Sequence, residues 1–197
     1  MSGNNTEQPP PRGRDETRAA LLSAAAQCFA VRGIRNTSVR EIAQKARVNH
    51  GLVHRHFGSK ERLLKTLLSE LSNRVDSHLD SLYDQDSPPP PEQLLPLIFS
   101  GTSEVGLHWR VVLRALLEGI PPEELQSQFP VFKRLVSSYR VHGYDETKAL
   151  AEAVLTFSTG LGFLTFQEYL AAAVEDSGGE WTNLKPRLMG RFLTRST

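Results

Sequence analysis

The chain has 197 residues, of which 39% are hydrophobic and 23% charged, and its formal net charge is +1. This composition predicts a globular protein with its own core and excludes collagen-like and low-complexity chains. The single cysteine, Cys28, excludes an intramolecular disulfide and a CxxC zinc site. No apolar run approaches the roughly 20 residues that span a bilayer, and the start lacks a secretory signal. We therefore expect a cytoplasmic protein without a membrane partner or a cofactor.

The small net charge hides an asymmetry along the chain. Residues 12–74 carry a net charge of +8, whereas residues 75–197 carry a net charge of −6. Such a difference predicts a polyanion as the partner of the first part. A chance excess of basic residues on a solvated surface is the plainer alternative.

Apolar residues recur at helical spacing throughout and strand signals are absent, so the predicted fold class is all-α. Residues 1–13 are polar and proline-rich, which predicts a flexible amino-terminal arm. Arg12, Arg14 and Arg18 lie in or beside this arm, where arginines enter minor grooves or hold phosphates. A role in solubility alone is the alternative for them.

Three helices are predicted after the arm. The first spans residues 14–31, and Gly33 stops it. A second begins at Ser38, which forms an S-x-x-E capping box with Glu41, and Asn49 caps the third. Two short helices separated by about three residues and backed by another make a helix-turn-helix domain, predicted for residues 14–58.

The second helix of the pair is the one expected to read DNA. Its amino end offers side chains for base edges and thymine methyl groups, and the basic residues that follow suit phosphates. The candidate DNA-binding residues are Thr37, Ser38, Arg47, Asn49, His50, Gly51, Leu52, Val53, His54, Arg55, His56 and Lys60. His50 and His54 are also spaced as metal ligands are, but no HExxH glutamate or second cysteine assists, so no metal site is expected.

A long amphipathic helix is predicted over about residues 59–83, ended by the proline run of residues 88–91. Further helices are predicted over residues 91–104, 108–118, 122–140, 145–174 and 183–194. Together these elements make a second, all-helical domain, residues 59–197.

Residues 17–64 resemble the amino-terminal DNA-binding domain of TetR/AcrR-type transcriptional regulators. The resemblance lies in the first helix, in "TSVREIA" and in "HFGSKERLL", and it covers about the first third of the chain. It implies a sequence-specific repressor that a small-molecule ligand releases from a double-stranded DNA operator. By the same resemblance, Thr37 and Ser38 begin the phosphate-contacting helix and Lys60 holds the DNA backbone.

The resemblance also implies a homodimer, because one helix-turn-helix covers one half-site and two are needed about 34 to 36 Å apart. The last two helices carry apolar stripes and small residues that resemble the four-helix interface of this family. The candidate interface residues are Leu150, Val154, Phe157, Gly160, Leu161, Leu164, Leu184, Leu188 and Phe192. Packing within the monomer is the alternative for some of them.

Aromatic and polar residues of the second domain could line an apolar pocket for a partly apolar small molecule. The candidates are Phe99, Thr102, His108, Trp109, Tyr139, Phe163, Phe166 and Tyr169. Ordinary core packing is the alternative. A ligand that prefers one tilt of the helix over residues 59–83 would change the distance between the two helix-turn-helix domains of a dimer, here called the reading heads. It would thereby alter the affinity for DNA.

An enzyme is not expected, because the chain has no GxSxG, P-loop, GxGxxG or HExxH motif. A non-specific architectural DNA-binding protein or a protein-interaction adaptor remains the competing interpretation. Salt dependence separates the two, since purely electrostatic binding has no sequence preference and weakens steeply with salt.

Overall fold

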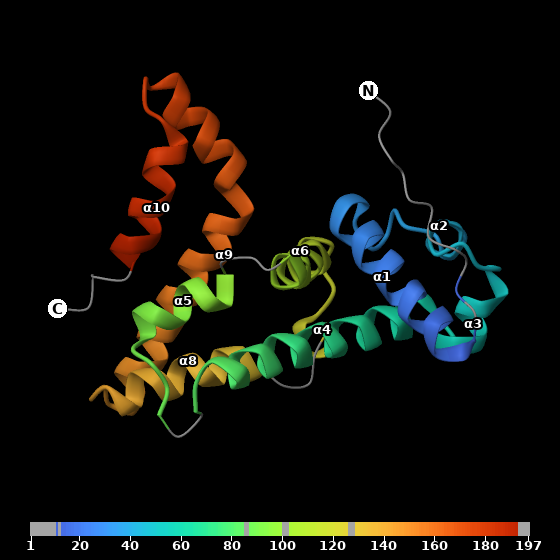
Figure 1. Ribbon diagram of the computed structural model, residues 1–197, viewed down its shortest axis with the longest axis horizontal. Helices are drawn as coiled ribbons and strands as arrows, with labels where there is room; N and C mark the ends of the chain where they lie inside the picture. Colours follow the sequence, from blue (N-terminus) through green and yellow to red (C-terminus); the bar gives the residue numbers. More distant parts are fainter. Residues whose placement is uncertain (1–10, 12, 85–86, 100–102, 126–128, 193–197) are drawn as a thin grey trace. The chain divides into compact units, whose positions relative to one another are not determined.

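The structure is a computed structural model, and it describes residue 11 and residues 13–84, 87–99, 103–125 and 129–192. In this part of the chain every regular element is an α-helix, which confirms the all-α prediction. The helices are α1 (Arg14–Arg32), α2 (Val39–Lys45), α3 (Gly51–Phe57), α4 (Lys60–Leu82), α5 (Pro91–Phe99), α6 (Ser103–Leu117), α7 (Pro122–Leu125), α8 (Pro130–Val141), α9 (Glu146–Asp176) and α10 (Trp181–Phe192) (Figure 1).

The prediction of one helix over residues 122–140 is wrong. The structure has α7 and α8 there, and Pro130 is the first residue of α8. Proline suits the first turn of a helix because its missing N–H would have no partner there in any case. A proline inside the predicted helix thus marks a helix start. The predicted segment over residues 91–104 likewise contains the end of α5 and the start of α6.

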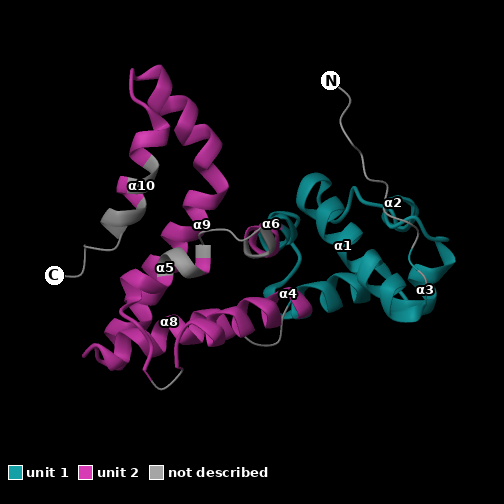
Figure 2. Ribbon diagram, in the orientation of Figure 1, with its two compact units in different colours: residues 1–69, 111–126 teal, residues 70–110, 127–197 magenta. Residues whose placement is uncertain are grey.

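The chain forms two compact units (Figure 2). Unit 1 contains residues 1–69 and 111–126, and unit 2 contains residues 70–110 and 127–197. The helices α4 and α6 each contribute residues to both units. The start of α4 and the end of α6 are grouped with the three amino-terminal helices in unit 1.

The core of unit 1 is built from the predicted apolar stripes. Leu21 and Phe29 of α1, Ile42 of α2, Val53 of α3 and Leu63 of α4 are all fully buried. Burying each such side chain contributes about 1.5 to 3 kcal/mol to the free energy of unfolding. This core fixes α1 to α3 as one body. Cys28 lies half-buried at its edge, and burial raises the pKa of the thiol, which makes the thiolate scarce.

The core of unit 2 joins α5, α8 and α9, with α8 packed chiefly on α9. Leu79, Leu94, Ile98 and Leu135 are fully buried in it. A clamp of ion pairs adds to this packing. The Arg134 guanidinium on α8 donates hydrogen bonds to the carboxylates of Asp76 and Asp80 on α4. These two helices are therefore held by charge as well as by apolar contact.

Candidate nucleic-acid interface

The turn between α2 and α3 has a defined conformation. Arg47 adopts a positive φ of 56°, the left-handed conformation that is unfavourable for residues other than glycine. The N–H of Val48 donates to the carbonyl of Ala43 (3.0 Å), and the N–H of Arg47 donates to that of Gln44 (3.0 Å). This is the Schellman arrangement, which ends a helix and fixes the direction of the chain that follows. The structure thus gives the turn before α3 a single path.

The amino end of α3 exposes the groups that a DNA reader needs. His50, Gly51, His54 and Arg55 are exposed, whereas Leu52 is half-buried. Asn49 accepts a hydrogen bond from the N–H of Gly51 at its Oδ1 (2.8 Å), but the N-cap of α3 is His50, one residue later than predicted. The ring of His54 bonds the carbonyl of Gly58 through Nδ1 (3.0 Å). The imidazole of His54 is therefore oriented by the end of its own helix.

Two of the predicted DNA contacts do not fit the structure. The side chains of Val53 and Thr37 are buried, with exposed fractions of 0% and 1%, so neither can reach a base edge or a phosphate. The hydroxyl of Thr37 instead donates to the carbonyl of Gly33 (2.7 Å). The ammonium of Lys60 donates to the carbonyls of Ile34 (2.9 Å) and Thr37 (3.1 Å). Lys60 thus holds the loop between α1 and α2.

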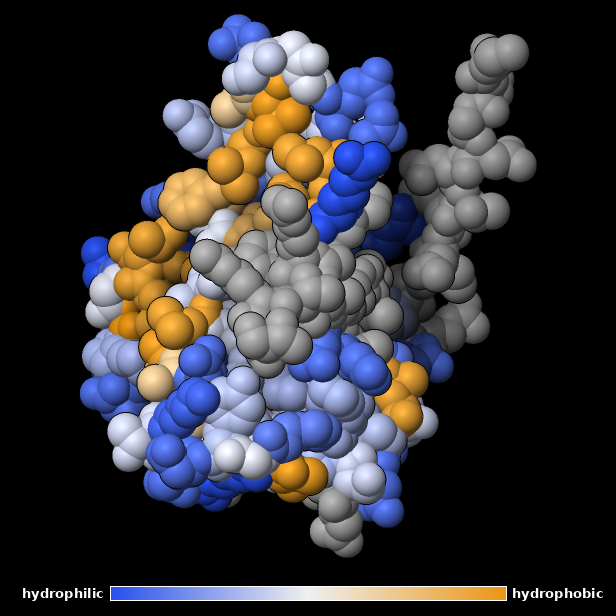
Figure 3. All heavy atoms as spheres, turned by 90° about the vertical axis from the view of Figure 1, so that its left-hand side faces the viewer, coloured by the Kyte–Doolittle hydropathy of each residue, from blue (hydrophilic) through white to orange (hydrophobic). Residues whose placement is uncertain are grey.

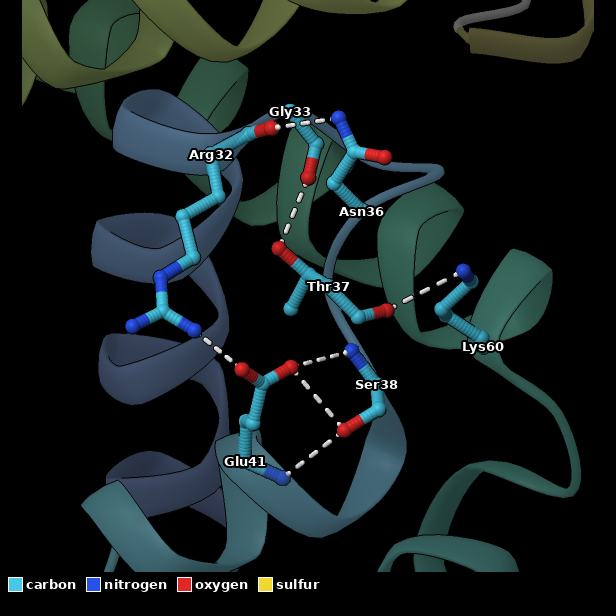
Figure 4. A network of polar contacts seen from close by, with 7 residues as sticks. All are labelled: Arg32, Gly33, Asn36, Thr37, Ser38, Glu41 and Lys60. Carbon is cyan, nitrogen blue, oxygen red and sulfur yellow. Dashed lines mark hydrogen bonds and ion pairs between the residues drawn. The ribbon is translucent and has the colours of Figure 1, made fainter.

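The start of α2 is fixed by the predicted capping box (Figure 4). Glu41 donates its N–H to the hydroxyl of Ser38, and the N–H of Ser38 donates to the Glu41 carboxylate (2.8 Å). Figure 4 shows that this carboxylate lies between Ser38 and the guanidinium of Arg32, with which it forms an ion pair. Hydrogen bonds from Ser38, with a smaller contribution from Arg32, lower the pKa of the Glu41 carboxyl. The first turn of α2 is thereby tied to the end of α1.

A cleft beside α3 was not predicted. It has a volume of about 470 Å³ and is lined by Gly13, Arg14, Thr17, Leu52, Arg55 and His56. The first turn of α1 and the outer face of α3 form it together, so two arginines and a histidine face one space. Arg40 on α2 is a further exposed basic residue that the sequence analysis did not single out. The excess charge of residues 12–74 was the signal that could have found both.

Comparisons with known proteins agree with this geometry. The model for bacterial regulatory proteins of the tetR family matches residues 21–67. The HTH-type transcriptional repressor Rv3405c of Mycobacterium tuberculosis is 34% identical over 163 residues, which cover 83% of this chain and 80% of the relative. This chain belongs to the TetR family.

Solved structures share the fold of this TetR-family protein. A putative transcriptional regulator from Streptomyces coelicolor has a TM-score of 0.65 at 20% identity and covers 90% of this chain and 94% of its own. A regulator from Saccharomonospora viridis, solved in complex with choline, has a TM-score of 0.64 at 15% identity, with coverages of 93% and 98%. The protein is a DNA-binding transcriptional regulator, and the relatives named as repressors support that role here.

The predicted effector residues of the TetR-family protein divide into buried and exposed groups. His108, Trp109 and Tyr139 are buried in unit 2. Phe166 and Tyr169 are 57% and 74% exposed, so their assignment to a pocket wall is wrong for the single chain. Phe163 stacks on Trp181 of α10 with ring centroids 5.9 Å apart. Thr102 and the side chain of Phe99 lie outside the described residues.

The one buried histidine of the described chain lies at the end of a chain of aromatic contacts. His108 packs edge to face on Trp109 (centroids 4.6 Å apart), which packs on Phe157 (5.1 Å), which in turn packs on Phe132 (5.7 Å). Burial lowers the pKa of His108 to about 4, so the ring is neutral at physiological pH. Its buried Nδ1 has no hydrogen-bond partner in the part of the chain that the structure describes.

The predicted interface residues also divide. Leu150 and Val154 of α9 are 42% and 52% exposed. Phe157 packs within the aromatic cluster and Gly160 is buried, so these two face their own unit. Leu161, Leu164, Leu184 and Leu188 are half-buried, and the side chain of Phe192 lies outside the described part. Further exposed apolar residues of α9, not among the predicted interface residues, are Leu155, Phe166, Tyr169 and Leu170.

The apolar surface of α9 is large. Figure 3 shows a band of hydrophobic side chains on the upper left of its view. By length and composition α9 could also cross a membrane, although the sequence analysis found no such run, and 17% of its most apolar window is buried. Core helices of soluble proteins meet the same criterion. Large exposed apolar patches commonly mark interaction sites.

Proposed function

We propose that this protein is a homodimeric, sequence-specific transcriptional repressor of the cytoplasm, and that a small, partly apolar molecule releases it from its operator. One observation supports the sequence-specific DNA binding in this proposal. The α2–α3 turn is fixed by a left-handed residue, and the helix that follows it exposes two histidines and an arginine. A rigid scaffold that presents donors at a helix start suits a major groove.

The exposed groups suggest a division of roles among the contacts. His50 and Gly51 lie at the amino end of α3, where base edges are reached, and Arg55 and Arg14 line the basic cleft. Ser38 begins α2, whose first N–H groups favour a phosphate. Phosphate contacts raise the affinity for DNA of any sequence, whereas base contacts at the amino end of α3 make the protein prefer one DNA sequence over others.

Selection from a random-sequence DNA pool tests this function without knowledge of the operator. Fluorescence anisotropy then compares the selected duplex with a scrambled duplex at about 150 mM salt, and we expect a preference of at least about a hundredfold. The variant Arg55→Ala should weaken both affinities, whereas Arg187→Ala, which removes an exposed arginine of α10, should change neither. A pool that stays random after selection would favour the architectural or adaptor interpretation.

His108 carries the effector part of the proposal. A buried, unpaired ring nitrogen is costly, by about 1 to 3 kcal/mol, unless something pairs with it. Neighbouring aromatic rings favour an apolar or aromatic body. The effector we propose is therefore an uncharged or weakly charged aromatic molecule with a group that hydrogen-bonds Nδ1 of His108.

A thermal-shift screen of phenols and aromatic alcohols, followed by titration of the protein–DNA complex, tests this effector class. We expect compounds that stabilise the protein to lower its affinity for the selected duplex, and His108→Leu to lose that response while keeping DNA binding. Compounds that bind the protein but leave DNA affinity unchanged would oppose release by ligand. An equal response in His108→Leu would oppose the role of His108.

The exposed face of α9 supports the homodimer. Leu150, Val154, Leu155, Phe166 and Tyr169 present an apolar surface that a second copy would cover. The resemblance to the four-helix interface of the family points the same way. A dimer also explains the apolar composition of α9 without a membrane, because the exposed apolar face of α9 would be buried against the second copy.

A further inference from the structure

The loop between α1 and α2, residues 33–38, is held by a residue far away in the sequence. Glu118 follows the end of α6, and its carboxylate accepts two backbone hydrogen bonds from this loop. Oε1 accepts from the N–H of Ile34 (2.8 Å), and Oε2 accepts from the N–H of Arg35 (2.7 Å). Successive N–H groups that converge on one carboxylate form an anion-binding nest. Bonds to an ionised acceptor are also stronger than neutral ones.

Gly33 makes room for this carboxylate. Its φ of +85° is a conformation that residues with side chains rarely adopt. A Cβ at position 33 would also collide with Oε1 of Glu118. The glycine therefore serves two purposes, since it ends α1 and leaves the space that Glu118 occupies. Only the first of these purposes was evident from the sequence.

The same loop is held from its other side by α4. Lys60 donates to the carbonyls of Ile34 and Thr37, so a cation and an anion grip neighbouring peptide groups of one loop. Ser38 ends the loop and caps α2. The position of the loop therefore sets the position of the first turn of α2, which is one of the proposed DNA contacts.

We propose that Glu118 is a positioning residue of the DNA-reading head, through which α6 sets the affinity for specific DNA. The inference rests on the proposed function, because it concerns the affinity of that same reading head. The helix α6 carries His108 and Trp109, and Glu118 directly follows its last residue. A shift of α6 along its axis moves the Glu118 carboxylate, and the loop loses its two bonds or moves with it.

Two substitutions at position 118 distinguish the effect of the two backbone hydrogen bonds from the effect of the negative charge of Glu118. Glu118→Gln keeps one acceptor oxygen and replaces the other with an NH₂ donor, which cannot accept from a backbone N–H. Glu118→Asp keeps the charge but is shorter by one methylene group, so it cannot reach both N–H groups. Glu123→Gln is the matched control, because it removes the same charge from an exposed residue of α7.

The experiment measures the affinity of all four proteins for the selected and scrambled duplexes. We expect Glu118→Gln and Glu118→Asp to bind the selected duplex about fivefold or more weakly, with little change for the scrambled duplex. Glu123→Gln should match the wild type. Equal affinities of the Glu118 variants and the control would overturn the inference.

Amide hydrogen exchange at Ile34 and Arg35 supplies a second readout that does not depend on DNA. Both amides should exchange about fivefold faster or more in the Glu118 variants, while amides of α9 keep their wild-type rates. Unchanged exchange at both positions would overturn the contact itself. If the wild type does not distinguish the two duplexes, the proposed function fails first, and exchange still reports on the contact.

Discussion

Replacing the buried histidine should change how the stability of the protein depends on pH. His108 is 1% exposed, and burial lowers its pKa from 6.5 to about 4. Between these two values the unfolded chain binds a proton that the folded chain rejects. The stability from this group is therefore complete above pH 6.5 and is lost as the pH falls toward 4. The variant His108→Leu lacks this loss.

The size of the effect follows from the two pKa values. A tenfold difference in proton affinity corresponds to about 1.4 kcal/mol, so the full loss by pH 4 is about 3 kcal/mol. Moving from about pH 7.5 to pH 5 removes about 2 kcal/mol of it. Near pH 7.5, His108→Leu should be at least as stable as the wild type, because it removes a buried nitrogen for which the described residues supply no partner.

Urea unfolding followed by circular dichroism measures both quantities, at one protein concentration because a dimer is stabilised by mass action. The wild type should lose about 2 kcal/mol more than His108→Leu between the two pH values. His78→Gln, which removes an exposed imidazole of α4, should follow the wild type. If His108→Leu loses as much stability as the wild type, His108 is not a buried neutral group and the reasoning fails.

Four further substitutions test the reading head and the interface. Ser38→Ala removes the capping box and should lower the free energy of unfolding by about 1 kcal/mol in thermal unfolding, whereas Ser69→Ala should not; equal effects would contradict the cap. Arg47→Gly should raise the free energy of unfolding by about 1 kcal/mol because glycine tolerates the positive φ. An unchanged free energy of unfolding would mean that the turn is not strained. Val154→Asp and Tyr169→Asp should give monomers in sedimentation, whereas Leu117→Asp, at another exposed apolar residue, should stay dimeric; dimeric α9 variants would refute the interface.

Local features of this fold could be predicted from the sequence. The capping box joins Ser38 to Glu41, three residues apart, and the stripes of α1 and α4 repeat at helical spacing, so neighbouring residues contain the whole signal. The helix-turn-helix and its family followed from one continuous segment. The turn at Arg47 was also anticipated in place, although its left-handed conformation was not.

Contacts between distant residues could not be predicted in the same way. Glu118 and Ile34 are 84 residues apart, and nothing near either residue points to the other. The faces of α9 were a different problem, because a helix that is apolar on all sides has no periodic signal to tell inside from outside. Phe157 was therefore assigned to the dimer interface and Phe166 to a pocket, whereas Phe157 packs on Trp109 within its own unit and Phe166 is exposed.

The central claim is that two copies of this reading head bind two half-sites on one face of DNA. Its most direct test is the affinity of the wild type for the selected duplex with and without about five extra base pairs between the half-sites, which turn them to opposite faces. We predict that the insertion lowers the affinity to nearly that of the scrambled duplex. An affinity unchanged by the insertion would contradict the claim, because each head would then bind on its own.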